Sequence, residues 1–308
     1  KKFYNIADYL QKGDILILNS SRVINARLIG QKDRTGGVVE ILLNHPKNDY
    51  LWEAVGKNLK VGNIIRFKNS ALVASVEKKE KQDYLIRFNM KEENLKQEIK
   101  KIGQIPLPPY IIKERKGKTF PDDPKNYQTV YAKQEGSVAA PTAGLHFTPA
   151  LINSLKNQGV EIEELTLHVG LGTFLSPTTS DIERGRLHQE YYSLEESLIH
   201  KIIQAKKQKR RIIAVGTTTV RVLEHLFREM KNGADPKNLT NSSTDIFIYP
   251  PYQFLAVDGI ITNFHLPKSS LLMLISAFAK EDLIKSAYQS AISENYRFYS
   301  FGDAMLII

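Results

Sequence analysis

The chain has 308 residues, of which 42% are hydrophobic and 25% charged, and its formal net charge is +10. This length accommodates one large domain or two ordinary ones, and the composition is that of a globular protein rather than a disordered or fibrous one. The absence of cysteine excludes disulfide bonds, thiolate catalysis and thiolate metal sites, and no apolar run reaches the roughly 18 residues of a membrane span. The basic charge balance favours an acidic partner such as nucleic acid.

The first third of the chain predicts a strand followed by a small β-barrel. The apolar run at residues 14–18 is typical of a buried strand. From about Ile29 to Phe88, short alternating runs separated by polar turns indicate closely spaced strands. A helical pattern covers residues 90–102, and the proline-rich residues 105–110 predict an extended connection that is not helical.

The remainder of the chain alternates between strand and helix, which predicts α/β layer packing. The expected strands cover residues 163–169, 211–215, 244–249 and 254–262, and the expected helices cover residues 150–155, 197–207, 220–230 and 269–278. We therefore expect a discontinuous main α/β domain, residues 1–28 and 106–308. A small β-barrel domain with a trailing helix, residues 29–105, is inserted in it.

Residues 136–148, with the sequence GSVAAPTAGLHFT, form the most informative segment. Most of its side chains are very small, yet it carries the hydroxyls of Ser137 and Thr142 and the imidazole of His146. Small residues allow a flat ligand to lie against the backbone, and Thr148 followed by proline predicts the start of a helix. The pattern predicts a ligand-binding loop, and a tightly packed turn without a ligand is the alternative.

Two strand–loop–helix junctions, residues 215–219 and 262–270, are alike. Ligands in open α/β sheets collect at the carboxyl ends of strands, where helix N-termini offer free N–H groups. Gly216 would let a ligand approach the backbone. Thr217 and Thr218 could bond that ligand or only cap the helix.

Other polar residues near these junctions have two interpretations. Arg221 and Glu224 lie three residues apart on one helix and could pair with each other instead of contacting a ligand. His265 lies between apolar residues, where a histidine more often packs, but Asn263 beside it favours a functional role.

A strand that ends in residues 167–174, LHVGLGTF, places His168 next to two glycines. The G-x-G-x-x-G pattern is not met, which disfavours a dinucleotide site. His188 and Glu190 would share one face of an extended segment, but the histidine spacing fits no metal motif and no G-x-S-x-G is present. The basic residues 206–211 are either a phosphate-binding patch or a solvated helix end.

Together these motifs resemble the S-adenosylmethionine:tRNA ribosyltransferase-isomerases of queuosine biosynthesis. The resemblance covers essentially the whole chain in the expected order. The segments that carry it are GDILILNSSRVINARL, TGGVVEILL, GQIPLPPYI, YQTVYA, GSVAAPTAGLHFT, TLHVGLGTF, IAVGTTTVR, TNFHLP and YRFYSFGDAM.

This resemblance implies a cytoplasmic enzyme of the pentosyltransferase class, with an α/β domain and an inserted small β-barrel. Such an enzyme transfers and isomerises the ribosyl group of S-adenosylmethionine onto a 7-aminomethyl-7-deazaguanine base at the tRNA wobble position. The product is epoxyqueuosine-tRNA, and adenine and methionine are released. S-adenosylmethionine is then a consumed substrate, so no cofactor and no metal is expected, and tRNA is the macromolecular partner.

The sulfonium acidifies the adjacent ribose carbon, so the reaction needs a general base, and His146, His168 and His265 are the candidates in that order. The sequence alone does not show which of these three histidines is the general base. The expected substrate contacts are small or polar residues of the same loops: Arg22, Ser137, Thr142, Gly144, Gly170, Gly172, Thr173, Gly216, Thr217, Thr218, Arg221 and Asn263.

The chain departs from the family pattern at two positions of its motifs and at its N-terminus. Ser20 stands where the family usually has aspartate. Gly185 stands where the family usually has histidine, and the histidine usual at that position is therefore not an indispensable base. Because the sequence begins at Lys1 without the family's N-terminal stretch, we expect a further N-terminal segment. The alternatives are a non-catalytic RNA-binding module and an S-adenosylmethionine methyltransferase.

Overall fold

The computed structural model describes residues 1–80, 83–170, 172 and 177–308. They divide into two compact units, which are discontinuous in sequence. The first contains residues 1–22, 128–134 and 140–308, and the second contains residues 23–127 and 135–139. Strands β2 (Ser21–Val23) and β9 (Gln134–Ser137) contain points where the chain passes from one unit to the other.

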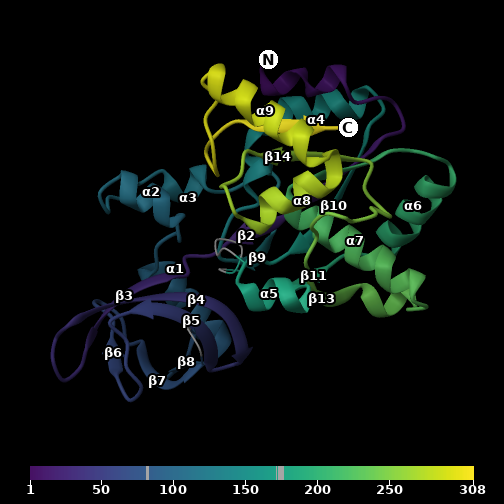
Figure 1. Cartoon of the computed structure of the whole chain (residues 1–308). Helices are drawn as coiled ribbons and strands as arrows, with labels where there is room; N and C mark the ends of the chain where they lie inside the picture. Colours follow the sequence, from purple (N-terminus) through teal and green to yellow (C-terminus); the bar gives the residue numbers. More distant parts are fainter. Residues whose placement is uncertain (81–82, 171, 173–176) are drawn as a thin grey trace. The chain divides into compact units, whose positions relative to one another are not determined.

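The second unit is built around a closed antiparallel barrel, which confirms the predicted small barrel inserted in an α/β fold (Figure 1). Its strands follow the order β3-β4-β5-β8-β7-β6. Their bounds are β3 (Arg27–Lys32), β4 (Val38–Asn48), β5 (Leu51–Lys57), β6 (Ile64–Arg66), β7 (Val73–Glu80) and β8 (Asp83–Phe88). Alternate residues of each strand are buried, as expected when one face of a sheet lines a barrel interior.

Helices follow the barrel, and one of them corrects an expectation. Helix α1 (Glu92–Ile102) matches the predicted pattern, and α3 (Asp123–Asn126) comes later. Residues 105–108 are extended as predicted, but α2 (Pro109–Glu114) begins inside the proline-rich run that we expected to be non-helical. Pro109 is the first helical residue, where a missing N–H costs no intrahelical hydrogen bond.

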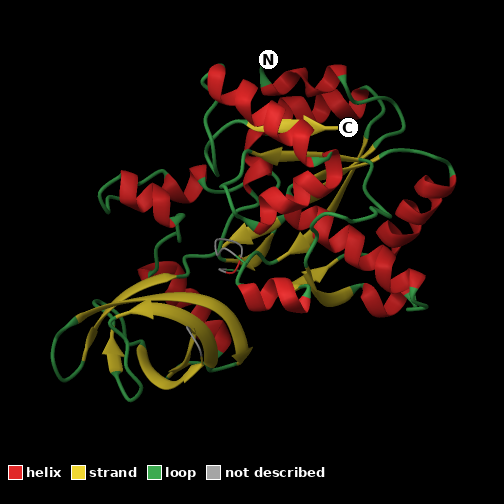
Figure 2. Cartoon of the chain, in the orientation of Figure 1, coloured by secondary structure: helices red, strands yellow, loops and turns green. Residues whose placement is uncertain are grey.

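A mixed sheet with helices packed on it forms the centre of the first unit (Figure 2). Its strand order is β13-β11-β10-β1-β12-β14-β15, and β10, β1, β12 and β14 run parallel. The strand bounds are β1 (Ile15–Asn19), β10 (Glu161–Leu167), β11 (Arg186–Ser193), β12 (Ile212–Val215), β13 (Asn241–Ile246), β14 (Gly259–Asn263) and β15 (Ala304–Ile307).

The helices of this unit connect the strands and pack on the sheet. Helix α7 contacts β1, β10, β12 and β14, and α4 packs beside η1 (Figure 1). Their bounds are η1 (Phe3–Asp8), η2 (Thr142–His146), α4 (Pro149–Asn157), α5 (Thr179–Arg184), α6 (Glu196–Lys207), α7 (Thr217–Lys231), η4 (Pro236–Leu239), α8 (Ser270–Ala279) and α9 (Glu281–Ser293).

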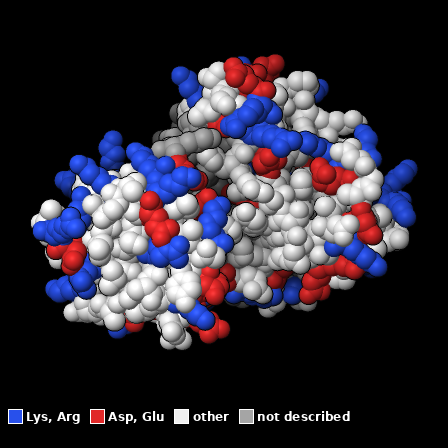
Figure 3. Space-filling model, turned by 90° about the horizontal axis from the view of Figure 1, so that it is seen from below, with Lys and Arg blue, Asp and Glu red and all other residues white. Residues whose placement is uncertain are grey.

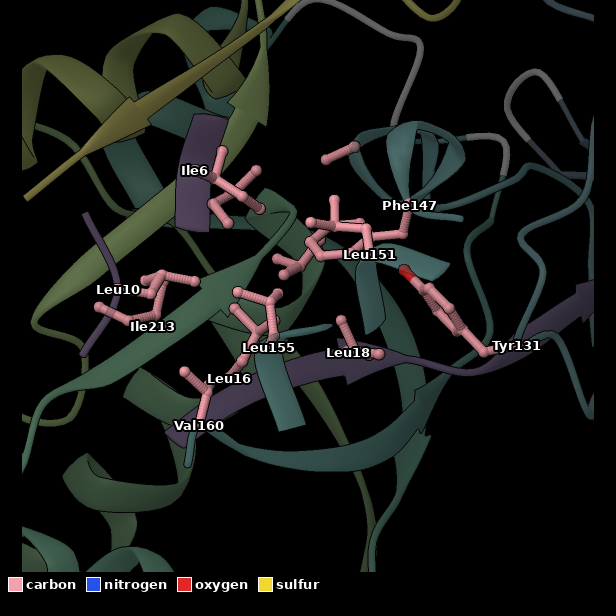
Figure 4. Close-up of a cluster of buried hydrophobic side chains, with 13 residues drawn as sticks. Ile6, Leu10, Leu16, Leu18, Tyr131, Phe147, Leu151, Leu155, Val160 and Ile213 are labelled. Atoms are coloured by element: carbon pink, nitrogen blue, oxygen red, sulfur yellow. The ribbon is translucent and has the colours of Figure 1, made fainter. Parts of the chain in front are cut away.

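Strand β1 is buried along its whole length because both faces of the sheet are covered. Leu16 and Leu18 belong to a hydrophobic cluster with residues of η1, α4 and β12 (Figure 4). Side chains alternate between the two faces of a strand, so Ile15 and Ile17, which are also buried, point to the opposite face. The continuous apolar run that predicted a buried strand thus contributes side chains to the hydrophobic packing on both faces of the sheet.

Candidate functional site

The parallel strands of the first unit end along a common edge of the sheet, and most of the predicted site residues follow those ends. The last residues of β10, β1, β12 and β14 are Leu167, Asn19, Val215 and Asn263. Ligands of open α/β sheets bind outside the carboxyl ends of the strands. This edge is therefore the candidate site.

Asn263 is the centre of a hydrogen-bonded cluster at this edge. Its Oδ1 accepts from the Thr142 hydroxyl at 2.8 Å, and its Nδ2 lies 3.2 Å from Nε2 of His146. Nδ2 also donates to the backbone carbonyl of Asp303 at 3.4 Å, which fixes the orientation of the amide because a carbonyl only accepts. Nε2 of His146 must therefore accept, and the proton of its neutral ring lies on Nδ1.

The His146 ring is half-buried, with Phe3 on one side and charged residues, among them Asp303, nearby. It stacks on Phe3 with 4.9 Å between ring centroids, and it lines a surface cavity of about 1030 Å³. Burial is the largest effect on its pKa and lowers it below the usual 6.5, while the nearby Asp303 carboxylate acts in the opposite direction. The imidazole is therefore neutral at pH 7.

The start of α7 lies close to the small-residue loop. Gly216, the residue before the helix, has φ of 89°, a conformation that favours glycine. A Cβ at Gly216 would lie 3.9 Å from Cβ of Ala143 and 3.5 Å from Oγ1 of Thr218. Thr217 and Thr218 are each only 6% exposed. The Thr218 hydroxyl has no hydrogen-bond partner among the described residues.

Gly144 packs directly against the side chain of Tyr131. A Cβ at Gly144 would overlap the Tyr131 hydroxyl and would lie 2.8 Å from a methyl carbon of Thr129. Both hydroxyls are buried and have no partner within the part of the chain that the structure describes. The Tyr131 ring points its hydroxyl toward Phe147 (Figure 4), and burial raises the pKa of this hydroxyl. Buried polar atoms without partners are rare, and a bound ligand is one way in which they are satisfied.

Arg221 forms a buried ion pair with Glu190 on β11. Burial lowers the pKa of Arg221 to about 10, so it remains a cation at neutral pH. Glu190 also accepts from the backbone N–H of Gly170 at 3.4 Å. The alternative pairing of Arg221 with Glu224 is wrong, because the Glu224 carboxylate accepts from the backbone N–H groups of residues 255–257.

The other predicted residues of the glycine-containing segment lie near these groups or outside the described residues. His168 follows β10, is half-buried, and donates its backbone N–H to the carbonyl of Tyr191 at 3.0 Å. Gly172 packs so closely on His188 that a Cβ there would lie 2.8 Å from its side chain. Thr173 lies outside the described residues.

His265 is buried two residues beyond Asn263. Its Nε2 lies 2.9 Å from the Thr262 hydroxyl, and its backbone N–H donates to the Tyr288 hydroxyl at 2.7 Å. Burial lowers the pKa of His265 to about 4. Of the remaining predicted contacts, Arg22 is half-buried in β2 of the first unit, and Ser137 is buried in the second unit.

The basic residues 206–211 lie at the opposite edge of the sheet, immediately before β12, and most of their cations are paired. The ion pairs are Lys206–Asp258 at 2.8 Å, Arg210–Glu161 at 2.5 Å and Arg211–Asp14 at 2.6 Å. Asp14, the partner of Arg211, is 1% exposed. This cluster therefore joins the amino ends of neighbouring strands, which favours a structural role over a phosphate patch.

The structure adds residues that sequence reasoning did not assign to the site, among them Glu190, Tyr131 and Phe3. Their positions depend on partners far away in the chain, although Tyr131 belongs to the YQTVYA segment already quoted. Among the described residues, no group of three or more His, Cys, Asp or Glu side chains is placed to hold a metal ion. None of the described helices combines the length and hydrophobicity that crossing a membrane requires.

Comparison with known proteins yields consistent matches over the whole chain. A family described as queuosine biosynthesis protein matches residues 1–307. A relative from Natranaerobius thermophilus, named S-adenosylmethionine:tRNA ribosyltransferase-isomerase, is 50% identical over 99% of this chain and 87% of its own length. A relative of the same name from a Sulfurihydrogenibium species is 46% identical over 99% of this chain and 88% of its own length.

A solved structure is also similar. It is the crystal structure of an S-adenosylmethionine tRNA ribosyltransferase from Thermotoga maritima. The two sequences are 33% identical, the TM-score is 0.51, and the match covers 99% of this chain and 86% of that chain. The family match, the named relatives and the solved structure therefore indicate the same protein family.

Proposed function

The chain belongs to the queuosine biosynthesis protein family, and from this premise we propose that it is a tRNA-modifying ribosyltransferase-isomerase. The observation that carries the proposal is the 50% identity over 99% of the chain with a relative of that name. The substrates are S-adenosylmethionine and a tRNA whose wobble position carries 7-aminomethyl-7-deazaguanine. The products are epoxyqueuosine-tRNA, adenine and methionine.

The strand ends of the first unit suit the nucleoside part of S-adenosylmethionine. The small-residue loop passes close to Gly216, and its residues there, Ala143 and Gly144, have little or no side chain. A flat base can therefore approach the backbone. The buried hydroxyl of Tyr131, which lacks a partner among the described residues, would hydrogen-bond such a ligand. We place the adenosine group in this region.

The hydrogen bond from Asn263 supports a division of roles among the histidines. It occupies the Nε2 lone pair of His146, so this ring offers a donor at Nδ1 rather than a free base. A neutral imidazole of this kind would stabilise negative charge that develops on the departing purine. His168, at the neighbouring strand end, is then our candidate base for the proton of the ribose carbon next to sulfur.

His265 has a supporting role in this proposal. Its ring is buried and its Nε2 interacts with Thr262. This interaction holds the loop that directly follows Asn263 in place.

The amine of the deazaguanine base loses a proton and forms its bond to the anomeric carbon as the bond to adenine breaks, and adenine leaves with a proton. Methionine leaves when the ribose carbon–sulfur bond breaks and a ribose oxygen bonds to that carbon to form the epoxide. The retained groups must be held in place while this occurs, which requires a preorganised pocket.

A net charge of +10 favours association with tRNA. Lys and Arg side chains are spread over much of the surface drawn in Figure 3, with Asp and Glu among them. Because phosphate contacts release counterions, tRNA affinity is expected to fall steeply as salt increases. A tRNA substrate also places the reaction in the cytoplasm.

Isotopic labels in S-adenosylmethionine test the proposed function. Label in the ribose carbons should appear in the deazaguanine-containing tRNA, and label in the methyl group should leave with methionine. Transfer of methyl label to tRNA would instead indicate a methyltransferase. Salt-sensitive tRNA binding without any transfer of label would indicate an RNA-binding module.

A further inference from the structure

The first turn of α7 has no side-chain cap at its N-cap residue. Gly216, its N-cap residue, has no side chain that could accept from the first N–H groups of this 15-residue helix. Those N–H groups and the positive end of the helix dipole favour a negatively charged group. The feature is shared by many helices, so it requires independent support.

The Thr218 side chain gives that support. It is 6% exposed, and its Oγ1 has no hydrogen-bond partner among the described residues. This oxygen lies 3.5 Å from the position of a Cβ on Gly216, so the hydroxyl is turned back toward the helix start. Thr219 is different, because its buried hydroxyl donates to the carbonyl of Val215 at 2.8 Å. One of two adjacent buried threonine hydroxyls is therefore left for a ligand.

Arg221 adds a third kind of donor to the same face. It follows Thr218 by three residues, and positions three apart are neighbours on a helix surface. Its side chain is 7% exposed, and Nε has no partner within the described chain although the guanidinium pairs with Glu190. Backbone N–H groups, a hydroxyl and a guanidinium N–H thus occur together near the start of one helix.

We propose that the first turn of α7 binds the α-carboxylate in the methionine part of S-adenosylmethionine. This inference rests on the proposed function. A carboxylate matches the donors in charge and in hydrogen bonding. The burial of Thr217 and Thr218 favours a small ligand arm over the phosphate backbone of a folded tRNA. The carboxylate takes no part in the bond changes, so it can remain fixed throughout the reaction.

Decarboxylated S-adenosylmethionine is the matched ligand for the test, because it keeps adenosine, sulfonium and amine. Equilibrium binding of both ligands is measured for the wild-type protein, Thr218→Val, Thr218→Ser and Thr219→Val. Wild type should bind S-adenosylmethionine at least about tenfold more tightly than the analogue, as a hydrogen bond to a charged group warrants. Thr218→Val should remove most of this difference, while Thr218→Ser and Thr219→Val preserve it.

The contrary outcomes separate this proposal from the function on which it rests. Equal affinity of the wild-type protein for the two ligands overturns the carboxylate site alone. The same conclusion follows if Thr218→Val, shown to be folded by circular dichroism, weakens the binding of both ligands equally. Failure of wild type to bind either ligand overturns the proposed function as well.

Discussion

The amide nitrogen of Asn263 donates a hydrogen bond to Nε2 of His146 at 3.2 Å, although the two residues are 117 positions apart. The contact joins the end of β14 to the small-residue loop and determines which ring nitrogen carries the proton. His146 therefore offers a donor rather than a free base. Of the relationships in the candidate site, this one has the most direct consequences for mechanism.

Asn263→Asp should change both the tautomer of His146 and the rate. The carboxylate accepts from Nε2–H and raises the pKa of the ring, because a neighbouring anion favours the charged imidazolium. We expect kcat to fall by about 10²-fold, at the lower end of acid–base contributions, and its pH profile to shift. Nitrogen NMR of the ring should show Nδ1–H in the wild-type protein, and Nε2–H there would contradict the assignment. Asn157→Asp, on the exposed side of α4, is the matched control.

Removing one member of the Glu190–Arg221 pair should destabilise the fold. Both side chains are buried, and loss of one partner leaves an uncompensated charge. Glu190→Gln or Arg221→Met should lower the free energy of unfolding by about 3–5 kcal/mol in urea denaturation. The double variant should regain most of that loss. Additive losses would show that the two side chains do not act as a pair.

Tyr131→Phe should separate stability from ligand binding. The hydroxyl is buried without a partner among the described residues, so its removal relieves a desolvation penalty. We expect the ligand-free protein to be as stable as wild type or more stable in thermal unfolding, with weaker binding of S-adenosylmethionine. Unchanged ligand affinity would leave the hydroxyl without a role in the site. Gly144→Ala should be better tolerated in this background, because its Cβ would overlap the removed hydroxyl.

His265 should make stability depend on pH in mildly acidic solution. Burial lowers its pKa from 6.5 to about 4, so between these values the unfolded chain binds more protons than the folded chain. Stability is therefore lost as the pH falls from about 6.5 toward 4. The contribution of His265 is about 3 kcal/mol, at 1.36 kcal/mol for each pKa unit. His265→Gln should flatten unfolding free energy against pH in this range, and an unchanged slope would contradict the burial argument.

The spacing of apolar residues predicted most of the helices and strands, because that spacing follows which side chains of an element are buried. The apolar run of β1 and the alternation in the barrel strands both correspond to described strands. The expected strand at residues 254–262 was wrong in its first half, since β14 begins at Gly259. Residues 255–257 give their N–H groups to the Glu224 carboxylate, not to a neighbouring strand. No sequence pattern predicts that the carboxylate of a helix residue will accept hydrogen bonds from the backbone of a distant loop.

The candidate site was predictable in its residue types but not in its partners. Thr142, His146 and Asn263 all stood out as polar residues in loops, and the structure places them in one cluster. The pairing of Arg221 depends on β11 lying in the same sheet as the strands around α7. Sequence spacing suggested a local partner, and the tertiary fold supplied a distant one. Which histidine acts as base stays a prediction.

Release of adenine and methionine from S-adenosylmethionine is the decisive measurement of ribosyltransferase-isomerase activity. The purified protein is incubated with S-adenosylmethionine and tRNA carrying 7-aminomethyl-7-deazaguanine, and both products are quantified together with the mass of the modified nucleoside. We expect equal amounts of adenine and methionine, dependent on that tRNA, and a nucleoside that has gained the rearranged ribosyl group. Absence of both products, or their release with no change in the tRNA, would contradict the proposed function.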